Sequence, residues 1–370
     1  MTAKNKPKIL FLVQLPPPIH GASLMNQFLV NSILLNEKFS KKVLNLDFVT
    51  NVSQIGKFSL GKILKMFKVS FVLFKTLLTS KFDLVYFTLS PVGGAFYRDA
   101  LFVFILKLFN SKIVYHLHGK GISEEVNNPF KKFVYKFVFH NVSVICLSEL
   151  LNYDIKDVFK GDIYNVPNGI PVVSSTDSNK NLRDIIYLSS LKKSKGVLDF
   201  VESLHILNLK NIDFQAKIIG SSTNDLTVDE LKKRIIDYGL EKKVRVLGPI
   251  YGDNKFKELA SSGIFCFPTY YRNECFPLSI LEAMMMGLIP VSTNNGAIEE
   301  IINHETNGMI VKMNNPVELA NTLSELLSKS DEELIKLSYS AKIKFNTYYT
   351  IEIFESKIID VFNKILVLND

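Results

Sequence analysis

The chain has 370 residues, 47% of them hydrophobic, which is enough for two domains with a core each. It contains no run of eighteen apolar residues free of charge, so no membrane-spanning helix is expected. Its three cysteines are scattered in apolar runs, which favours neither a disulfide framework nor a metal site. The first residues lack the layout of a signal peptide, and we therefore expect a cytoplasmic protein.

Charge is distributed unevenly along the chain. Residues 1–175 hold 21 Lys and Arg against 10 Asp and Glu, a net charge of +11. The remaining residues hold 23 against 26, a net charge of −3. This asymmetry predicts an anionic partner for the first half.

Short apolar runs alternate with longer helical patterns, which is typical of parallel β/α units. The strands expected in the first half are 8–14, 83–88, 112–117, 142–147 and 163–166. Those expected in the second half are 184–188, 216–219, 244–247, 264–267, 289–291 and 309–311. The pattern predicts two doubly wound α/β domains, 1–173 and 182–349, separated by a polar linker at 174–181.

Two segments of the first half, 57–75 and 131–137, mix lysines with large apolar residues. In the first segment the lysines would share one helix face and the apolar residues would be available to the other. These residues are Lys62, Lys65 and Lys68 on one side and Ile63, Phe67 and Phe74 on the other. The pattern fits a helix on an anionic membrane surface, or a core helix with a lysine-rich wet face.

The net charge of the first half favours the membrane surface over the core-helix alternative. Nucleic acid is not expected as a partner, because no recognition motif accompanies the charge.

Glu274 and Glu282 are separated by seven residues across an expected junction between a loop and a helix. Pro277 disfavours helix before it and favours the first helical position for itself. Between the two carboxylates lies a helix N-terminus, which attracts phosphate. Two surface glutamates at this spacing are common, but the apolar residues between them indicate burial, where a carboxylate needs a partner. Hydroxyl-binding carboxylates around a phosphate site predict a nucleotide sugar as ligand.

With these residues the chain resembles the GT-B glycosyltransferases, and within them the retaining glycosyltransferase family 4. The resemblance extends over nearly the whole chain as six blocks in order. They are Pro16–Gly21, Tyr115–Gly119, Val166–Ile170, Ser189–Gly196, Glu274–Glu282 and Gly296–Ile302. In this fold class the C-terminal helix, here 350–370, is expected to pack back on the first domain.

The resemblance implies roles for residues of the second domain. Glu282 would bind the ribose hydroxyls, and Glu274 would contact hydroxyls of the donor sugar. Lys195 would neutralise phosphate charge as the glycosidic bond breaks. The backbone N–H groups of Cys275 and Phe276 would help to bind the donor sugar. Those of Leu278 and Ser279 would bind the distal phosphate.

Other implied roles are less direct. His118 would orient the donor sugar, although His116 shares its strand face. Gly21 would let the backbone of the first loop approach the phosphates. Ser190 stands where many family members have an arginine, so that Lys192 or Lys193 would have to supply the second cation.

The reaction implied is retaining transfer from a nucleoside diphosphate sugar to a lipid-linked or polysaccharide acceptor at the cytoplasmic membrane face. No metal or other cofactor is expected, since the chain has no Asp-x-Asp triplet. Two alternatives stay open: a GT-B epimerase or phosphorylase, and a scaffold protein that has lost catalysis.

Overall fold

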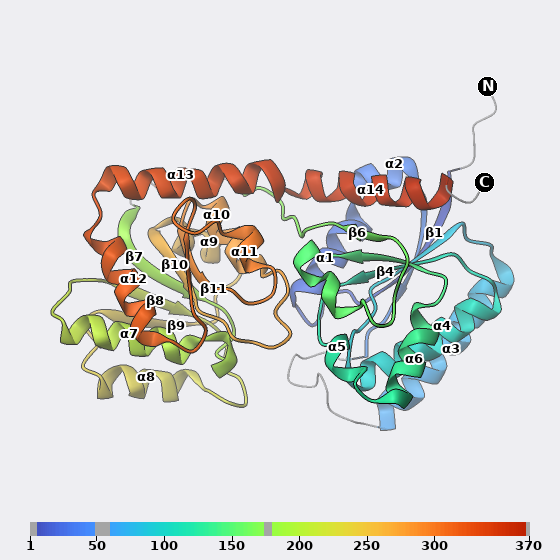
Figure 1. The fold of residues 1–370 in the computed structure, drawn as a ribbon, viewed down its shortest axis with the longest axis horizontal. Coiled ribbons are helices and arrows are strands. Elements are labelled where there is room, and N and C mark those ends of the chain that lie inside the picture. Colours follow the sequence, from blue (N-terminus) through green and yellow to red (C-terminus); the bar gives the residue numbers. More distant parts are fainter. Residues whose placement is uncertain (1–5, 49–59, 174–179, 368–370) are drawn as a thin grey trace. The chain divides into compact units, whose positions relative to one another are not determined.

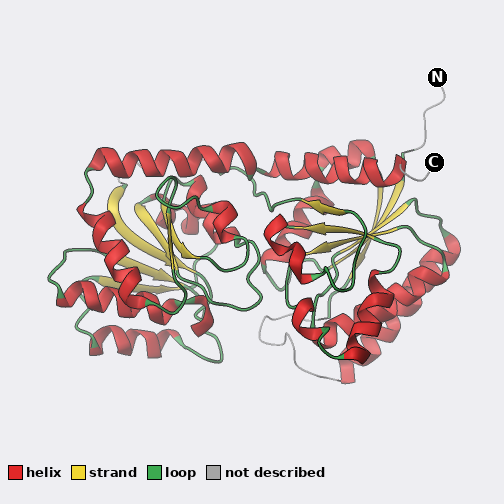
Figure 2. Cartoon of the chain, in the orientation of Figure 1, coloured by secondary structure: helices red, strands yellow, loops and turns green. Residues whose placement is uncertain are grey.

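The computed structural model describes residues 6–48, 60–173 and 180–367 (Figure 1). The chain divides into two compact units. The first comprises Met1–Asn168 together with Ile351–Asp370, and the second Gly169–Thr350. Each unit contains a six-stranded parallel sheet with helices packed against it (Figure 2). No helix within the described residues is both long and apolar enough to cross a membrane.

The first unit has the strand order β2-β1-β3-β4-β5-β6, with every neighbouring pair parallel. Its strands are β1 (Lys8–Val13), β2 (Ser40–Asn45), β3 (Leu84–Phe87), β4 (Ile113–Leu117), β5 (Ser143–Cys146) and β6 (Ile163–Asn165). Its helices are α1 (Gly21–Asn31), α2 (Ile33–Lys38), α3 (Leu60–Thr79), α4 (Gly93–Leu108), α5 (Ile122–Glu125), α6 (Pro129–Phe139), η2 (Glu149–Asp154) and α14 (Ile351–Val367).

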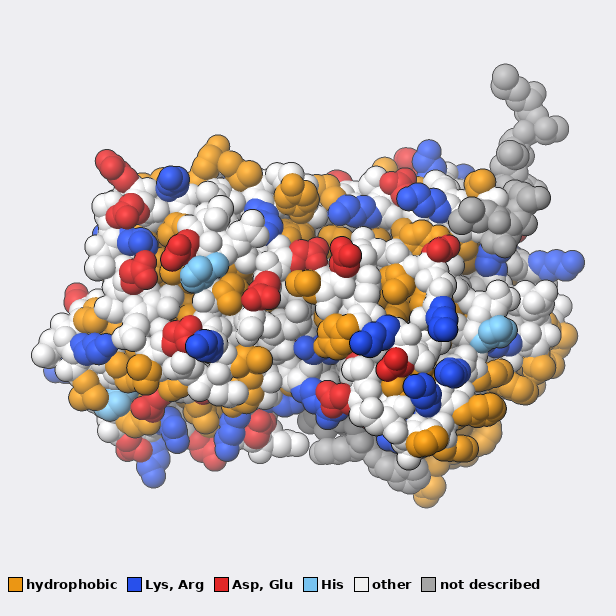
Figure 3. All heavy atoms as spheres, in the orientation of Figure 1, with side chains coloured by type: hydrophobic (Ala, Val, Ile, Leu, Met, Phe, Trp, Pro, Cys, Tyr) orange, Lys and Arg blue, Asp and Glu red, His pale blue; other side chains and the backbone are white. Residues whose placement is uncertain are grey.

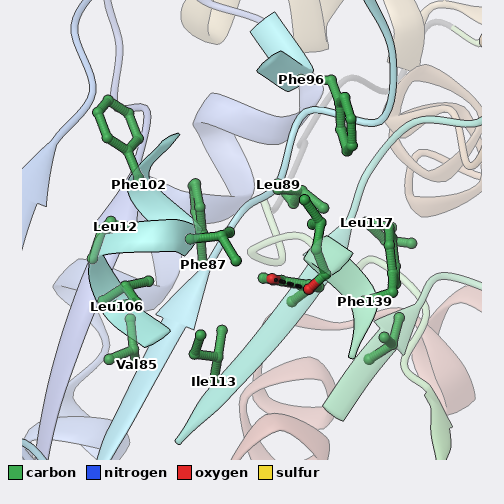
Figure 4. Packing of buried hydrophobic residues seen from close by; sticks show 14 of the residues in the cluster. Leu12, Val85, Phe87, Leu89, Phe96, Phe102, Leu106, Ile113, Leu117 and Phe139 are labelled. Carbon is green, nitrogen blue, oxygen red and sulfur yellow. Dashed lines mark hydrogen bonds between the residues drawn. The ribbon is translucent and has the colours of Figure 1, made fainter. Parts of the chain in front are cut away.

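Successive residues of a strand point to opposite faces of a sheet, and the central strands of this sheet are buried on both faces. Leu12, Val85 and Phe87 lie on one face, in a hydrophobic cluster that includes residues of α3, α4 and α6 (Figure 4). The other face packs against α14, where the ring of Phe362 lies 6.2 Å from Phe11 and 5.7 Å from Tyr86. Residues at both ends of the chain therefore build this one core.

The second unit has the strand order β12-β11-β10-β7-β8-β9, again with every pair parallel. Its strands are β7 (Asn181–Leu188), β8 (Ala216–Ile219), β9 (Val244–Gly248), β10 (Ser262–Phe267), β11 (Ile289–Thr293) and β12 (Met309–Val311). Its helices are η3 (Lys193–Lys195), α7 (Val197–Leu209), α8 (Val228–Asp237), α9 (Gly252–Ala260), α10 (Leu278–Met285), α11 (Ile298–Ile301), α12 (Pro316–Ser328) and α13 (Asp331–Tyr348).

All eleven expected strands are present, and the doubly wound α/β class is confirmed. β2 was missed because its sequence, SKKVLN, lacks a continuous apolar run; it lies at the edge of the sheet with most of its side chains outside the core. Pro277 is the N-cap of α10 in extended conformation rather than its first helical residue. Of the expected linker 174–181, residues 174–179 lie outside the described part of the chain.

The long helix α3 does not have the burial expected of a core helix. Its buried residues are Val69, Leu73, Thr76 and Leu77. Phe67 and Phe74, which a core helix would bury, are exposed. The helix therefore has an apolar face against the sheet and a second apolar face outside it.

Candidate functional site

The strand order of the second unit reverses between β7 and β10, since the chain proceeds from β7 to β8 on one side and from β10 to β11 on the other. In open α/β sheets, ligands bind at such a reversal, outside the carboxyl ends of the strands. Lys195 follows β7 and Glu274 follows β10. The structure brings these two side chains together, with Lys195 Nζ 2.5 Å from Glu274 Oε2.

The Lys195–Glu274 pair is mostly shielded from water, with side-chain exposures of 18% and 10%. Ion pairs in such surroundings gain strength from the low local dielectric, but either charge alone is costly. The ammonium of Lys195 also lies 4.5 Å from the ring centroid of Tyr271. Two groups that bind anions and hydroxyls are thus held at the point where this fold places its ligands.

Backbone contacts fix the loop that carries Lys195 against the loop after β10. The amide of Tyr270 donates to the carbonyl of Ser194 at 2.9 Å. Gly196, with φ +80°, lies so close to Pro268 that a Cβ would be 2.0 Å from the Pro268 carbonyl oxygen. Only glycine fits a left-handed conformation with such a contact.

The Glu274 segment is held from its other side by the turn after β11. The amide of Ala297 donates to the carbonyl of Cys275 at 2.8 Å, and Asn295 Nδ2 donates to the carbonyl of Tyr271 at 2.8 Å. A Cβ at Gly296 would lie 2.4 Å from the carbonyl oxygen of Glu274. The backbone around Glu274 is therefore fixed before any ligand binds.

The start of α10 lies between the two glutamates in sequence. Its N-cap, Pro277, provides no side-chain hydrogen bond. The first amides of a helix have no partner within the helix, so those of Leu278 and Ser279 are available to an anion. The two residues just before the cap, Cys275 and Phe276, are buried, and the ring of Phe276 packs against Tyr349 at 5.6 Å.

Glu282 is not part of the Lys195–Glu274 pair. Its Oε1 lies 2.6 Å from Nζ of Lys255, a residue near the start of α9. Burial raises the pKa of the Glu282 carboxyl above its ordinary value, and the Lys255 ammonium opposes this shift. Sequence reasoning did not find Lys255, because its partner is 27 residues away and no local motif links them.

The lysines near Ser190 differ in position. Lys192 Nζ lies 4.3 Å from the centroid of Tyr271, the same ring that Lys195 contacts. Lys193 instead donates its backbone N–H to Asp225 at 3.1 Å. Ser190 itself is half-buried, and its carbonyl accepts from the amide of Lys192 at 2.7 Å. Lys192 is therefore the lysine that shares surroundings with Lys195.

A cavity of about 470 Å³ also opens in the second unit, where β9 leads into α9. Its lining residues are Pro249, Ile250, Tyr251, Asn254, Lys257 and Glu258. No group of three or more His, Cys, Asp or Glu side chains is arranged to hold a metal ion within the described residues.

In the first unit, His116 within β4 and His118 just after it have different surroundings. His116 is fully buried, bonds Tyr86 Oη through Nδ1 at 2.6 Å, and lies 6.2 Å from the ring of Phe354. His118 is half-buried just beyond the carboxyl end of β4, with no hydrogen-bond partner for Nε2 among the described residues. Burial lowers the pKa of His118 to about 3, so its imidazole is neutral at physiological pH. Nε2 of His116 also has no hydrogen-bond partner among the described residues. The two histidines differ in that His116 is held inside the sheet by Tyr86, whereas His118 lies beyond the end of the strand and is less buried.

Gly21 is the exposed first residue of α1. The preceding His20 caps this helix, with its Nδ1 accepting from the amide of Ser23 at 3.3 Å. The side chain of His20 thus has a structural role as a helix cap. Gly21 lies after β1. The strand order of this sheet reverses at β1, because β2 lies on one side of it and β3 on the other.

Two Rossmann-like units, each with its own parallel sheet, define a GT-B protein, and solved structures of that fold match almost the whole chain. The crystal structure of Anabaena Alr3699/HepE in complex with UDP matches with a TM-score of 0.74 at 19% identity, covering 96% of this chain and 100% of that one. The sucrose-phosphate synthase of Thermosynechococcus elongatus matches with a TM-score of 0.74 at 14% identity, covering 98% and 100%.

Residues 173–344, most of the second unit, match the family model of glycosyl transferases group 1. Among curated relatives, the amylovoran biosynthesis glycosyltransferase AmsK of Erwinia amylovora is 25% identical over 66% of this chain and 62% of its own length. The N-acetyl-alpha-D-glucosaminyl L-malate synthase of Bacillus anthracis is 27% identical over 60% of both chains. The first curated relatives are matched over 35% to 62% of their own length.

Proposed function

We propose that the protein is a glycosyltransferase that moves a sugar from a nucleoside diphosphate, with UDP as the favoured nucleotide, to a lipid-linked or polysaccharide acceptor. The Lys195–Glu274 pair at the strand-order reversal carries this proposal. A nucleotide sugar offers each member a better-suited partner, the diphosphate for Lys195 and sugar hydroxyls for Glu274. The UDP complex of Alr3699/HepE supports uridine as the base.

The nucleotide would be held by Glu282 and by the start of α10. Glu282 would accept hydrogen bonds from the ribose hydroxyls, with Lys255 keeping its carboxylate ionised against the effect of burial. The amides of Leu278 and Ser279 would receive the distal phosphate. Those of Cys275 and Phe276 would assist Glu274 with the donor sugar.

Lys195 and Lys192 would together supply the positive charge that the leaving diphosphate requires. Both ammonium groups lie over Tyr271, and Lys192 would therefore replace the arginine absent at Ser190. No metal would be needed, since two lysines and a helix N-terminus stabilise the same charge.

The transfer would retain configuration. The bond from the anomeric carbon of the sugar to the diphosphate breaks, the bond to the acceptor oxygen forms on the same face, and the diphosphate takes the acceptor's proton. His118, neutral because burial lowers its pKa to about 3, would orient the donor sugar by a hydrogen bond through Nε2. Gly21 would let the first loop approach the phosphates. The net positive charge of the first half supports a location at the cytoplasmic face of a membrane, as a peripheral protein.

The test is turnover of UDP-sugars by the purified protein, with and without EDTA, in the wild type and in single variants. Lys195→Ala should slow transfer by about 10²- to 10³-fold, the usual effect of losing one group that stabilises transition-state charge. Glu282→Gln should weaken UDP binding by about 10- to 100-fold, as a lost hydrogen bond to a charged group does. Lys192→Ala should slow transfer more than Lys193→Ala.

The other outcomes discriminate the remaining alternatives. Conversion of the donor sugar in the absence of any acceptor would indicate an epimerase. UDP binding without turnover of any donor would indicate a scaffold protein. Loss of activity in EDTA that Mg²⁺ restores would refute the metal-independent mechanism.

A further inference from the structure

An extended apolar surface lies on the outer side of the first unit, over α3, α4 and α6. The three helices are neighbours, with α3 against α4 and α4 against α6 (Figure 1). In Figure 3, hydrophobic side chains gather over these helices at the lower right. We refer to this surface as the three-helix face. Its exposed large apolar residues are Leu60, Leu64, Phe67, Phe71, Val72, Phe74, Leu78, Tyr97, Phe104, Leu108, Phe130, Phe133 and Phe137.

The spacing of these residues on α3 follows the helix repeat. From Leu60 to Leu78, all the exposed apolar residues of α3 except Val72 recur at intervals of four and three, which places them on one stripe. The stripe lies opposite Val69 and Leu73, which pack into the core. Phe67 and Phe71 are 59% and 69% exposed, too much for side chains that serve the fold.

The face continues from α4 to α6 through aromatic contacts. Phe104 of α4 lies 6.4 Å from Phe137 of α6, ring centroid to ring centroid. On α6 the most exposed residues are Phe130 and Phe133, at 73% and 72%. These rings extend the apolar surface of α3 over two more helices.

The charge of the face has one sign. α3 and α6 contain no Asp or Glu, and the single carboxylate of α4, Asp99, is buried and paired with Arg98 at 2.7 Å. Four lysines of the face have no carboxylate partner among the described residues, and Lys68 and Lys75 flank Phe71 at the spacing of one helical turn. The four are Lys68, Lys75, Lys132 and Lys136.

We infer that the three-helix face docks the protein on an anionic bilayer, with the phenylalanines entering the headgroup region and the lysines contacting acidic lipid headgroups. Apolar side chains flanked by lysines are the composition that binds such interfaces. A second copy of the chain fits less well, because two identical faces would bring lysines against lysines. This inference names the surface behind the peripheral membrane association of the proposed function. It rests on that function only where it takes the acceptor to be lipid-linked.

The experiment is flotation of the full chain with vesicles of phosphatidylcholine, or of phosphatidylcholine mixed with phosphatidylglycerol. We expect the protein to bind the mixed vesicles, and this binding should weaken as the salt concentration rises. Neutral vesicles should not bind the protein. The triple variant Phe67→Ser, Phe71→Ser and Phe133→Ser should lower the partition coefficient by at least about tenfold, since each loses apolar area in the membrane. Lys68→Gln, Lys75→Gln and Lys136→Gln together should lower it by about tenfold or more.

Matched variants in the second unit are the controls. Ile335→Ser, Tyr339→Ser and Ile343→Ser remove an exposed apolar stripe of α13, and Lys232→Gln with Lys233→Gln removes exposed lysines of α8. Neither should change vesicle binding. Unchanged melting temperatures will establish that all variants are folded.

Equal loss in the face and control variants would overturn the inference, as would equal binding to neutral vesicles. Dimerisation in sedimentation velocity that the phenylalanine variant abolishes, without vesicle binding, would assign the face to a second copy instead. Vesicle binding is measured without any donor sugar, so failure of the proposed transfer reaction leaves it intact. Conversely, transfer to a soluble acceptor does not depend on this face.

Discussion

Each of the two glutamates of the second unit has its own lysine, and the two pairs come from different elements. Lys195 reaches Glu274 from the loop after β7, whereas Lys255 reaches Glu282 from α9. The pKa of Glu282 is raised by burial, and Lys255 is the nearby cation that opposes this. Lys255 is thus the residue that favours the charged form of Glu282, the carboxylate that we propose for ribose binding.

Lys255→Met should make UDP binding more sensitive to acid. A protonated Glu282 accepts hydrogen bonds from ribose more weakly than the carboxylate does, so affinity falls as pH drops through its pKa. Because the pKa of Glu282 is already raised, removal of the cation raises it further, and the midpoint of this loss moves to higher pH. Calorimetric UDP titrations across the acid range measure the midpoint.

Lys232→Met, on the exposed face of α8, is the matched control and should leave the midpoint unchanged. If Lys255→Met lowered affinity equally at every pH, Lys255 would act on the fold of the site and not on the charge of Glu282.

At the scale of the elements, the site depends on how closely the loops after β7, β10 and β11 approach one another. Gly196 and Gly296 are the points of closest approach, each against a backbone carbonyl oxygen. A side chain at either position would push apart the loops that hold Lys195 and Glu274. The geometry of the ion pair therefore depends on two glycines, which have no side chain to bind a ligand.

Gly196→Ala should destabilise the second unit and weaken UDP binding, while Gly239→Ala should affect stability alone. Both glycines have positive φ, for which alanine costs roughly 1–2 kcal/mol. A Cβ at Gly239 meets nothing within 4 Å, whereas one at Gly196 collides with Pro268. Chemical denaturation of both variants measures the backbone strain that they share. UDP titration shows whether Gly196→Ala also displaces the loop.

Equal losses of stability in the two variants, with UDP affinity preserved in both, would show that the contact with Pro268 is easily relieved.

The elements that sequence predicted well are those whose signals are local. Continuous apolar runs predicted the buried strands. The spacing of Thr227 with Glu230 and of Ser330 with Glu333 is typical of capping boxes, and the structure has both. Gly239 follows the C-cap of the first of these helices and has the left-handed conformation of a C′ residue. The edge strand β2 was not predicted, since its exposed side chains give no apolar run.

Features that depend on tertiary contacts were not predictable in the same way. The Lys255–Glu282 pair joins two helices across strand β10, and nothing in the residues beside either one indicates the other. For α3 the sequence supplied the apolar residues and the lysines but not which side packs on the sheet. Only the packing shows that Phe67 and Phe74 face outward.

On the scale of the whole molecule, the first unit is assembled from both ends of the chain, and the second from the middle alone. The chain passes from the first unit to the second after Asn168 and returns after Thr350. α14 then covers the face of the first sheet that carries Phe11, Tyr86 and His116.

Phe362→Ala should destabilise the first unit and leave the second intact. Phe362 is fully buried against three aromatic rings, Phe11, Phe39 and Tyr86, and truncation of such a residue costs about 3–5 kcal/mol. Hydrogen exchange should accelerate in β1 and β3 but not in β7 and β10. Leu323→Ala, in the buried face of α12, should give the reverse pattern; acceleration in both units by either variant would mean that they unfold together.

The return of the chain through α14 also sets an order of events during synthesis on the ribosome. Domains made first usually fold first. Here the first unit stays incomplete, with one face of its sheet uncovered, until residues 351–367 have emerged. The second unit has all its strands and helices by residue 350, so the nascent chain completes the second unit before the first. A chaperone that shields Phe11 and Tyr86 during that interval would protect the part of the protein made earliest.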